Sequence, residues 1–166
     1  RLITNAISVT FNSTDSYDGW VLESGENTGA GGAINKNAST FIAGDDQKDR
    51  QYRSILSFNT NSLPDNAAIT AARVEIKKQG VVGTDPFGTH GVLLLEIRNG
   101  PFGNGAGLGV DDFSAAASPG FVRNQFSGLT FSWYGVPLSN ANLALINKYG
   151  LTQIRLYFSK DDNDDL

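Results

Sequence analysis

Apolar and polar residues alternate along several short stretches of the chain, a pattern typical of β-strands with one buried face. The densest such region is residues 52–78, where two alternating runs flank a turn containing Pro, Asp and Asn. Residues 52–59 are predicted to form the first strand and residues 72–77 the second. In the second strand Val74 and Ile76 share one face, whereas charged side chains occupy the other, which predicts a half-buried strand.

Further strands are predicted elsewhere in the chain. They are expected at residues 6–11, 40–44, 92–100, 121–126, 129–135 and 151–159, and residues 20–22 are a short apolar segment. Residues 92–100 are apolar on both faces over their first half, which is typical of a central strand. In residues 151–159 strict alternation predicts that Ile154 points inward and that Gln153, Arg155 and Tyr157 point outward.

The segments between these strands are rich in glycine, and only one of them has a helical pattern. Residues 23–39 hold few apolar side chains and are predicted to be a long surface loop. Residues 140–149 are predicted to form a short helix that begins at Ser139 or Asn140 and ends at a left-handed Gly150. The sequence therefore predicts an all-β fold: a two-sheet antiparallel β-sandwich, jelly-roll-like, with one short helix near 140–149.

Composition narrows the possible chemistry. The 166 residues fit one domain, 1–166. The chain has no cysteine and a single histidine, His90, which argues against disulfides, thiolate chemistry and a zinc site. His90 is expected to be a solvent-facing loop residue. The chain has a net charge of −4, and four acids cluster near its C-terminal end. The sequence has no stripe of basic residues that would indicate nucleic-acid binding. It also has no apolar run long enough to indicate insertion into a membrane.

Several segments together resemble the DNRLRE-type domain, a β-sandwich of secreted and cell-surface proteins of bacteria and archaea. The resemblance covers residues 16–166 and is clearest in the stretch RSILSFNTNSLPDNAAITAA. The residues that match the family pattern are Arg53, Leu56, Phe58, Leu63, Pro64, Ala67, Ile69 and Ala72. The resemblance implies a non-catalytic extracellular or cell-surface module, similar to carbohydrate-binding modules that bind acidic polysaccharides.

The resemblance also implies that the sandwich lacks its closing C-terminal strand. Members of the family continue past the acidic run with a closing strand, whereas this sequence ends at Leu166. The first residues lack an initiating Met and a signal peptide, so we interpret the chain as a mature or excised module of a longer protein. Either the chain has been cut, or a strand from elsewhere completes the sandwich, as in strand-donation assemblies.

Aromatic and arginine residues are the candidate ligand-binding groups. Trp133, Tyr134 and Trp20 could stack on a sugar ring, whose C–H faces pack well on a π-system. For Trp20, which lies beside two apolar residues, core or rim packing is the favoured alternative. Arg53 and Arg155 could pair with a polysaccharide carboxylate, or could instead form internal ion pairs.

Acidic residues are the candidate metal ligands. Asp161, Asn163 and Asp165 alternate at the end of a predicted strand and could direct three oxygens toward calcium. Asp45, Asp46 and Asp49 could contribute oxygens from a second loop. The alternative is a solvated acidic turn without metal.

These observations support two hypotheses of function. The first is a non-catalytic extracellular module that binds polysaccharide or a cell-surface glycan, with structural calcium as its possible cofactor. The second is a structural subunit of a surface layer, stalk or filament that self-assembles through open sheet edges. No carboxylate pair has a diagnostic spacing, so an enzyme is not expected.

Overall fold

The computed structural model describes residues 6–126, 129 and 131–162. Strands dominate it, joined by long connections and short helical turns. The elements are η1 Asp15–Tyr17, β1 Gly19–Glu23, β2 Gly31–Asn35, β3 Gly44–Asp45, β4 Gln51–Asn59, β5 Arg73–Lys77, α1 Pro86–Thr89, β6 Leu93–Asn99, η2 Val110–Phe113, β7 Asn124–Phe126, β8 Trp133–Pro137, α2 Asn140–Leu143 and β9 Leu151–Phe158. Within the described ranges, no helix has the length and apolar character needed to cross a membrane.

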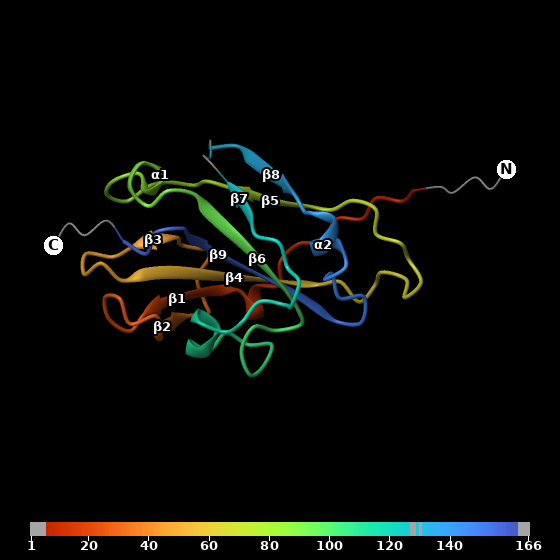
Figure 1. Cartoon of the computed structure of the whole chain (residues 1–166), viewed down its shortest axis with the longest axis horizontal. Coiled ribbons are helices and arrows are strands. Elements are labelled where there is room, and N and C mark those ends of the chain that lie inside the picture. The colour runs from red at the N-terminus through yellow and green to blue at the C-terminus, as the bar shows by residue number, and fades with distance from the viewer. Residues whose placement is uncertain (1–5, 127–128, 130, 163–166) are drawn as a thin grey trace.

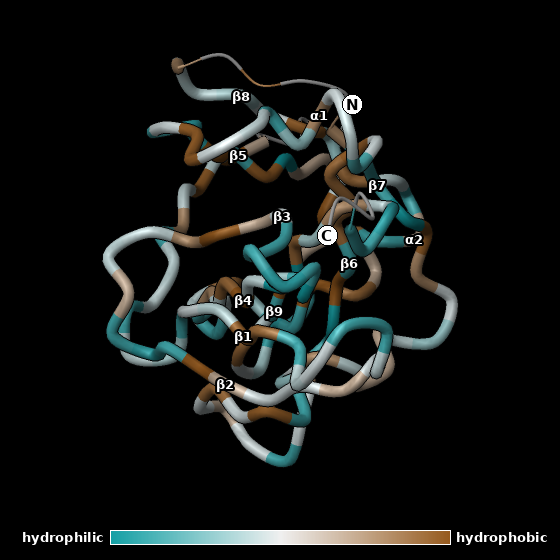
Figure 2. The backbone as a smooth tube through the Cα atoms, turned by 90° about the vertical axis from the view of Figure 1, so that its left-hand side faces the viewer, coloured by the Kyte–Doolittle hydropathy of each residue, from teal (hydrophilic) through white to brown (hydrophobic). Residues whose placement is uncertain are grey.

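The strands form two antiparallel sheets of unequal size (Figure 1). The larger sheet has seven strands in the order β2-β1-β4-β9-β6-β7, with β3 paired to β4, and the smaller sheet consists of β5 and β8. In Figure 2 the smaller sheet lies above the larger one. The predicted all-β, two-sheet antiparallel sandwich is therefore confirmed.

The first hydrophobic core fills the space between the two sheets. Its buried residues are Val74, Ile76, Leu93, Leu95, Phe126, Val136, Ile154, Leu156 and Phe158. Alternation brings every second residue of β9 and β6 to this core, and the same rule buries Val74 and Ile76 while Arg73, Glu75 and Lys77 stay exposed. The predicted orientation of β5 is confirmed.

A second core covers the opposite face of the large sheet. Val21 and Ile55 pack there against Phe102, Leu108 and Phe113, which belong to the connection between β6 and β7. Seven of the eight residues of β9 are consequently buried. The prediction that Gln153, Arg155 and Tyr157 point to solvent is wrong, because a loop without regular strands covers the face on which they lie.

Several predicted elements differ from the structure. Residues 6–11 form no strand, and residues 40–44 contribute only Gly44 to β3. The predicted loop 23–39 contains β2, whose glycines hide it from a pattern based on apolar side chains. A Cβ atom on Gly31 would lie 2.1 Å from the carbonyl oxygen of Val110, so the glycine allows β2 to pack closely against η2.

The helices are also shorter and more numerous than predicted. Ser139 caps α2 by accepting a hydrogen bond from the Asn142 N–H, but α2 ends at Leu143 and Gly150 has no left-handed conformation. Residues predicted as loop form α1, capped by Asp85, with Pro86 in its first turn.

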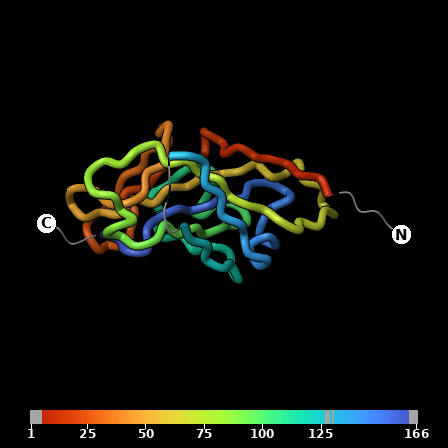
Figure 3. The backbone as a smooth tube through the Cα atoms, turned by 90° about the horizontal axis from the view of Figure 1, so that it is seen from above, coloured from red at the N-terminus to blue at the C-terminus, as the bar shows by residue number. Residues whose placement is uncertain are grey.

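A groove runs between the small sheet and the inner face of the large sheet, and several residues of the first core line it. Its walls include residues 6–13, 36–47 and β5, and its floor includes Leu56 and Phe58 of β4. In Figure 3 the first of these segments, in red, follows the upper edge of the molecule toward the end opposite α1. The rim of the groove continues onto the outside of the small sheet.

Candidate functional site

The outer face of the small sheet presents an exposed tryptophan among charged side chains. Residues that face each other across an antiparallel pair point to the same side, and Trp133 lies opposite Lys77. We call this surface the β5–β8 face and define it as Arg73, Glu75, Lys77, Trp133, Gly135 and Pro137. The Trp133 residue is 68% exposed, so most of its indole is free to contact a ligand.

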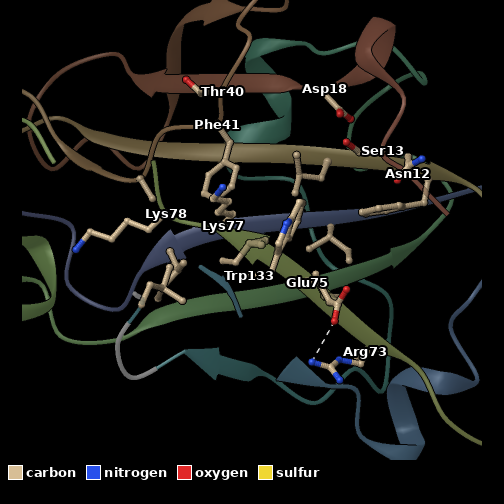
Figure 4. Close-up of a pocket in the computed structure, with 18 of the residues that line it drawn as sticks. Asn12, Ser13, Asp18, Thr40, Phe41, Arg73, Glu75, Lys77, Lys78 and Trp133 are labelled. Atoms are coloured by element: carbon tan, nitrogen blue, oxygen red, sulfur yellow. Dashed lines mark ion pairs between the residues drawn. The ribbon is translucent and has the colours of Figure 1, made fainter. Parts of the chain in front are cut away.

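Arg73 lies flat across this surface because its neighbour has no side chain. Gly135 is opposite Glu75, and a Cβ atom on Gly135 would lie 2.1 Å from Nη2 of Arg73. The same nitrogen is 3.1 Å from Oε1 of Glu75 (Figure 4). The β5–β8 face thus combines an aromatic surface with hydrogen-bond donors and an acceptor at its side.

Tyr134 and Trp20, also predicted to bind a ligand, lie elsewhere. Tyr134 follows Trp133 along the strand and therefore points to the opposite side, where its ring centroid lies 5.9 Å from that of Phe126. Trp20 is half-buried and meets Tyr52 edge to face at 5.1 Å. The structure does not bring these two side chains together with Trp133, so one sugar ring cannot contact all three.

Arg155 is buried, contrary to the prediction that it points outward. Its side chain is 5% exposed and donates to Glu96 through both Nε, at 3.0 Å, and Nη2. Its remaining terminal nitrogen donates to the carbonyl oxygens of Asp112, Phe113 and Ala115. Because these acceptors occupy the guanidinium, Arg155 fixes the connection between β6 and β7 to the sheet and is not available to a ligand.

Arg53 serves the same connection from β4. Its Nη1 donates to the Phe113 carbonyl oxygen at 2.7 Å, and its Nε donates to Gln51 at 2.6 Å. The guanidinium lies over the rings of Phe113, at 4.0 Å, and Tyr157, at 4.6 Å. These contacts fit the alternative in which Arg53 packs internally.

Glu96 is the acceptor of this buried network. It accepts hydrogen bonds from Tyr157 at 2.6 Å and from Arg123 at 3.0 Å, in addition to those from Arg155. Burial alone would raise the pKa of Glu96, but the positive charge of Arg155 and these hydrogen bonds bring it below the ordinary value. Burial, together with the proximity of Glu96, raises the pKa of Tyr157. Burial and the nearby Arg155 lower the pKa of Arg53.

The predicted metal ligands are only partly described. Asn163 and Asp165 lie outside the described residues, and Asp161 is exposed. Asp46 accepts from the backbone N–H groups of Lys48 and Arg50 and pairs with the Arg50 side chain. Asp45 lies 3.1 Å from His90. Among residues 6–126, 129 and 131–162, no group of three or more His, Cys, Asp or Glu side chains is arranged to hold a metal ion.

His90 is buried rather than solvent-facing. Its Nδ1 hydrogen-bonds with the Thr89 hydroxyl at 2.6 Å, and its ring meets Phe158 edge to face at 5.9 Å. Its Nε2 faces Oδ2 of Asp45 at 3.1 Å. These contacts connect the end of α1 with β9 and β3, so His90 is a structural residue.

Comparisons of the chain with protein-family models, with curated proteins and with solved structures found no match. The resemblance to the DNRLRE-type domain therefore stays a prediction from the sequence.

Sequence reasoning identified Trp133 but not the charged residues beside it. Arg73, Glu75 and Lys77 were predicted to be exposed, yet their partner strand is separated from them by more than fifty residues. The alternation of residues 129–135 was too weak to reveal that β8 pairs with β5. Only the register of that pair places Trp133 opposite Lys77.

Proposed function

We propose that this protein is a non-catalytic module that binds polysaccharide on the β5–β8 face. The observation that carries the proposal is the exposed indole of Trp133 on a sheet surface with charged neighbours. Indole stacks on the C–H face of a sugar ring, and the hydroxyl groups at the ring edge need polar partners. Arg73 and Lys77 would donate to those hydroxyls, and Glu75 would accept from them.

The shape of this surface favours a chain over a small molecule. The β5–β8 face borders the long groove, and an elongated surface contacts a polymer along its side, so that several weak contacts along the polymer add up. Two cations and one anion on the face also suit a polysaccharide that carries some carboxylate groups. With such a ligand, the module would attach a larger protein to an extracellular or cell-surface glycan.

Substituting Trp133 tests the proposal directly. Affinity electrophoresis in gels that contain a neutral or an acidic polysaccharide should retard the wild-type protein in at least one of them. Trp133→Ala should weaken this binding about tenfold, since aromatic contacts contribute roughly 1 kcal/mol or more and about 1.4 kcal/mol corresponds to a factor of ten.

Tyr149→Ala is the matched control, because Tyr149 is also an exposed aromatic residue, at 75%, but lies outside the β5–β8 face. It should bind like the wild type. Equal losses in both variants would indicate nonspecific aromatic adhesion. If no polysaccharide retards the wild-type protein, the proposed function is wrong.

A further inference from the structure

One edge of β5 carries no partner strand among the described residues. β5 pairs with β8 on one side, and no other described strand joins the small sheet. The backbone groups along an unpaired edge can pair with a further strand. Beneath this edge lies the groove, whose floor includes the partly buried side chains of Phe41, Leu56 and Phe58. An added strand would therefore gain both backbone hydrogen bonds and apolar contacts.

The same chain displays a segment with the pattern of such a strand. Residues 6–13, which we call the N-terminal segment, alternate apolar Ile7, Val9 and Phe11 with polar residues, and none of them is charged. Ile7 is 86% exposed and Val9 55% exposed. The segment lies at the wall of the groove without joining either sheet. Apolar residues on one side of an extended segment are expected to seek a buried surface.

We propose that the N-terminal segment of one copy adds as a strand to β5 of a second copy and fills its groove. Alternation would place Ile7, Val9 and Phe11 toward the groove, beside Val74 and Ile76, and would leave Ser8 and Thr10 outward beside Glu75. The segment carries no charge, so its insertion would bury no unpaired charge. This inference concerns assembly and does not depend on polysaccharide binding.

A second copy is the occupant for two structural reasons. Within its own chain the segment is held next to Thr14, whose N–H donates to the Ser57 carbonyl oxygen at 2.7 Å, and Ile7 and Val9 stay exposed although they lie at the wall of the groove. The segment also extends toward the end of the molecule opposite α1 (Figure 3). The donor segment and the edge of β5 are different parts of the chain, so each addition leaves a free donor and a free acceptor, and the product is an open chain or a ring.

Cysteine crosslinking can distinguish donation between chains from closure within one chain, because the protein has no cysteine of its own. Ser8→Cys and Glu75→Cys are made as separate proteins, mixed and oxidised. A disulfide-linked pair containing one of each should form in excess of the pair from Ser114→Cys and Glu75→Cys. Ser114 is exposed and lies in the connection that covers the other face of the large sheet.

The Ser8→Cys/Glu75→Cys double variant provides the opposing outcome. If it forms an intramolecular disulfide as a monomer while the mixed single variants stay unlinked, the segment closes its own sandwich and the proposal is overturned. Linked oligomers of the double variant would support it.

Light scattering over a range of concentrations gives an independent measurement. The wild-type protein should form oligomers that grow with concentration, and Val9→Asp should shift it to monomers by placing a charge on the donor strand. Val122→Asp is the control, since Val122 is similarly exposed, at 49%, but lies outside the segment and the groove. A wild-type protein that stays monomeric at every concentration would refute the proposal.

Discussion

Glu96 is the residue on which the buried charge of the second core converges. It neutralises Arg155 and accepts from Tyr157 and Arg123. A buried ion pair adds little net stability compared with an apolar pair, but removing one partner leaves a buried charge without compensation. Glu96 should therefore be among the positions of this chain that are most sensitive to substitution.

Glu96→Gln should lower the free energy of unfolding by about 3 kcal/mol at neutral pH, because Arg155 loses its counter-charge. The wild-type carboxylate has a lowered pKa in the folded state, so its contribution is complete above its ordinary pKa of 4.5 and is lost as the pH falls through the folded-state value. Urea unfolding of both proteins at about pH 7 and about pH 3 should show a difference that shrinks in acid.

Glu75→Gln is the control for this measurement, since Glu75 forms an exposed ion pair with Arg73. Such pairs contribute roughly 0–1 kcal/mol. Burial raises the pKa of Asp18 and of Asp112, so both oppose Glu96 by favouring the folded state as the pH falls. Asp18 and Asp112 are present in both the wild type and Glu96→Gln, so their effects cancel when the two free energies of unfolding are subtracted. A difference that stays constant with pH would contradict the role given to Glu96.

At the scale of elements, the connection between β6 and β7 acts as a third layer. It has no strand of its own, but its carbonyl oxygens accept from Arg53 and Arg155, and its Phe102 N–H donates to Gln153 at 2.7 Å. The Gln153 amide also donates to the Ala106 carbonyl oxygen. Long polar side chains of the sheet thus substitute for the ladder hydrogen bonds that a second sheet would supply.

Gly31→Ala tests how closely this layer packs on β2. The added methyl would overlap the Val110 carbonyl oxygen, which is backbone and cannot rotate away. We expect a loss of about 1–3 kcal/mol in the free energy of unfolding, measured by thermal or urea denaturation. Gly105→Ala, where a Cβ atom would have nothing within 4 Å, should change stability little. Equal effects at the two positions would mean that β2 and η2 are not tightly packed.

Alternation and apolar runs predicted the strands that carry apolar side chains, and they failed where small residues removed the contrast. β4, β5, β6 and β9 were all predicted close to their observed bounds. β2 consists largely of small residues, so it carried no apolar signal. Residues 6–11 have a strand pattern but no partner strand in the structure, which shows that pairing as well as pattern decides a strand.

At the scale of the molecule, the two sheets differ in how they are supported. The large sheet is covered on both faces, whereas the small one has two strands and one covered face. Two strands alone are barely stable in water. Amide hydrogen exchange should therefore be slowest in β9 and β4 and faster in β5 and β8 by at least about tenfold. Uniform protection across both sheets would contradict this difference.

The burial of Arg155, which was a candidate binding residue, could not have been predicted from the sequence. Arg155 in an alternating strand has the pattern of an exposed residue, because nothing in β9 itself indicates that residues more than forty positions earlier cover it. Its burial depends on the strand order β4-β9-β6 and on the path of a glycine-rich loop. The exposure of Trp133 could be predicted, because a strand with few apolar residues offers little buried surface against which a large aromatic side chain can pack.

The position of β9 also determines when the sheet can form. β9 is the last of the described strands, yet it lies between β4 and β6 and pairs with both. Until residue 158 has left the ribosome, the two halves of the large sheet have no common neighbour. Pairings so distant in sequence form slowly. The growing polypeptide is thus expected to lack its complete large sheet until β9 has left the ribosome, with unpaired strands exposed in the interval.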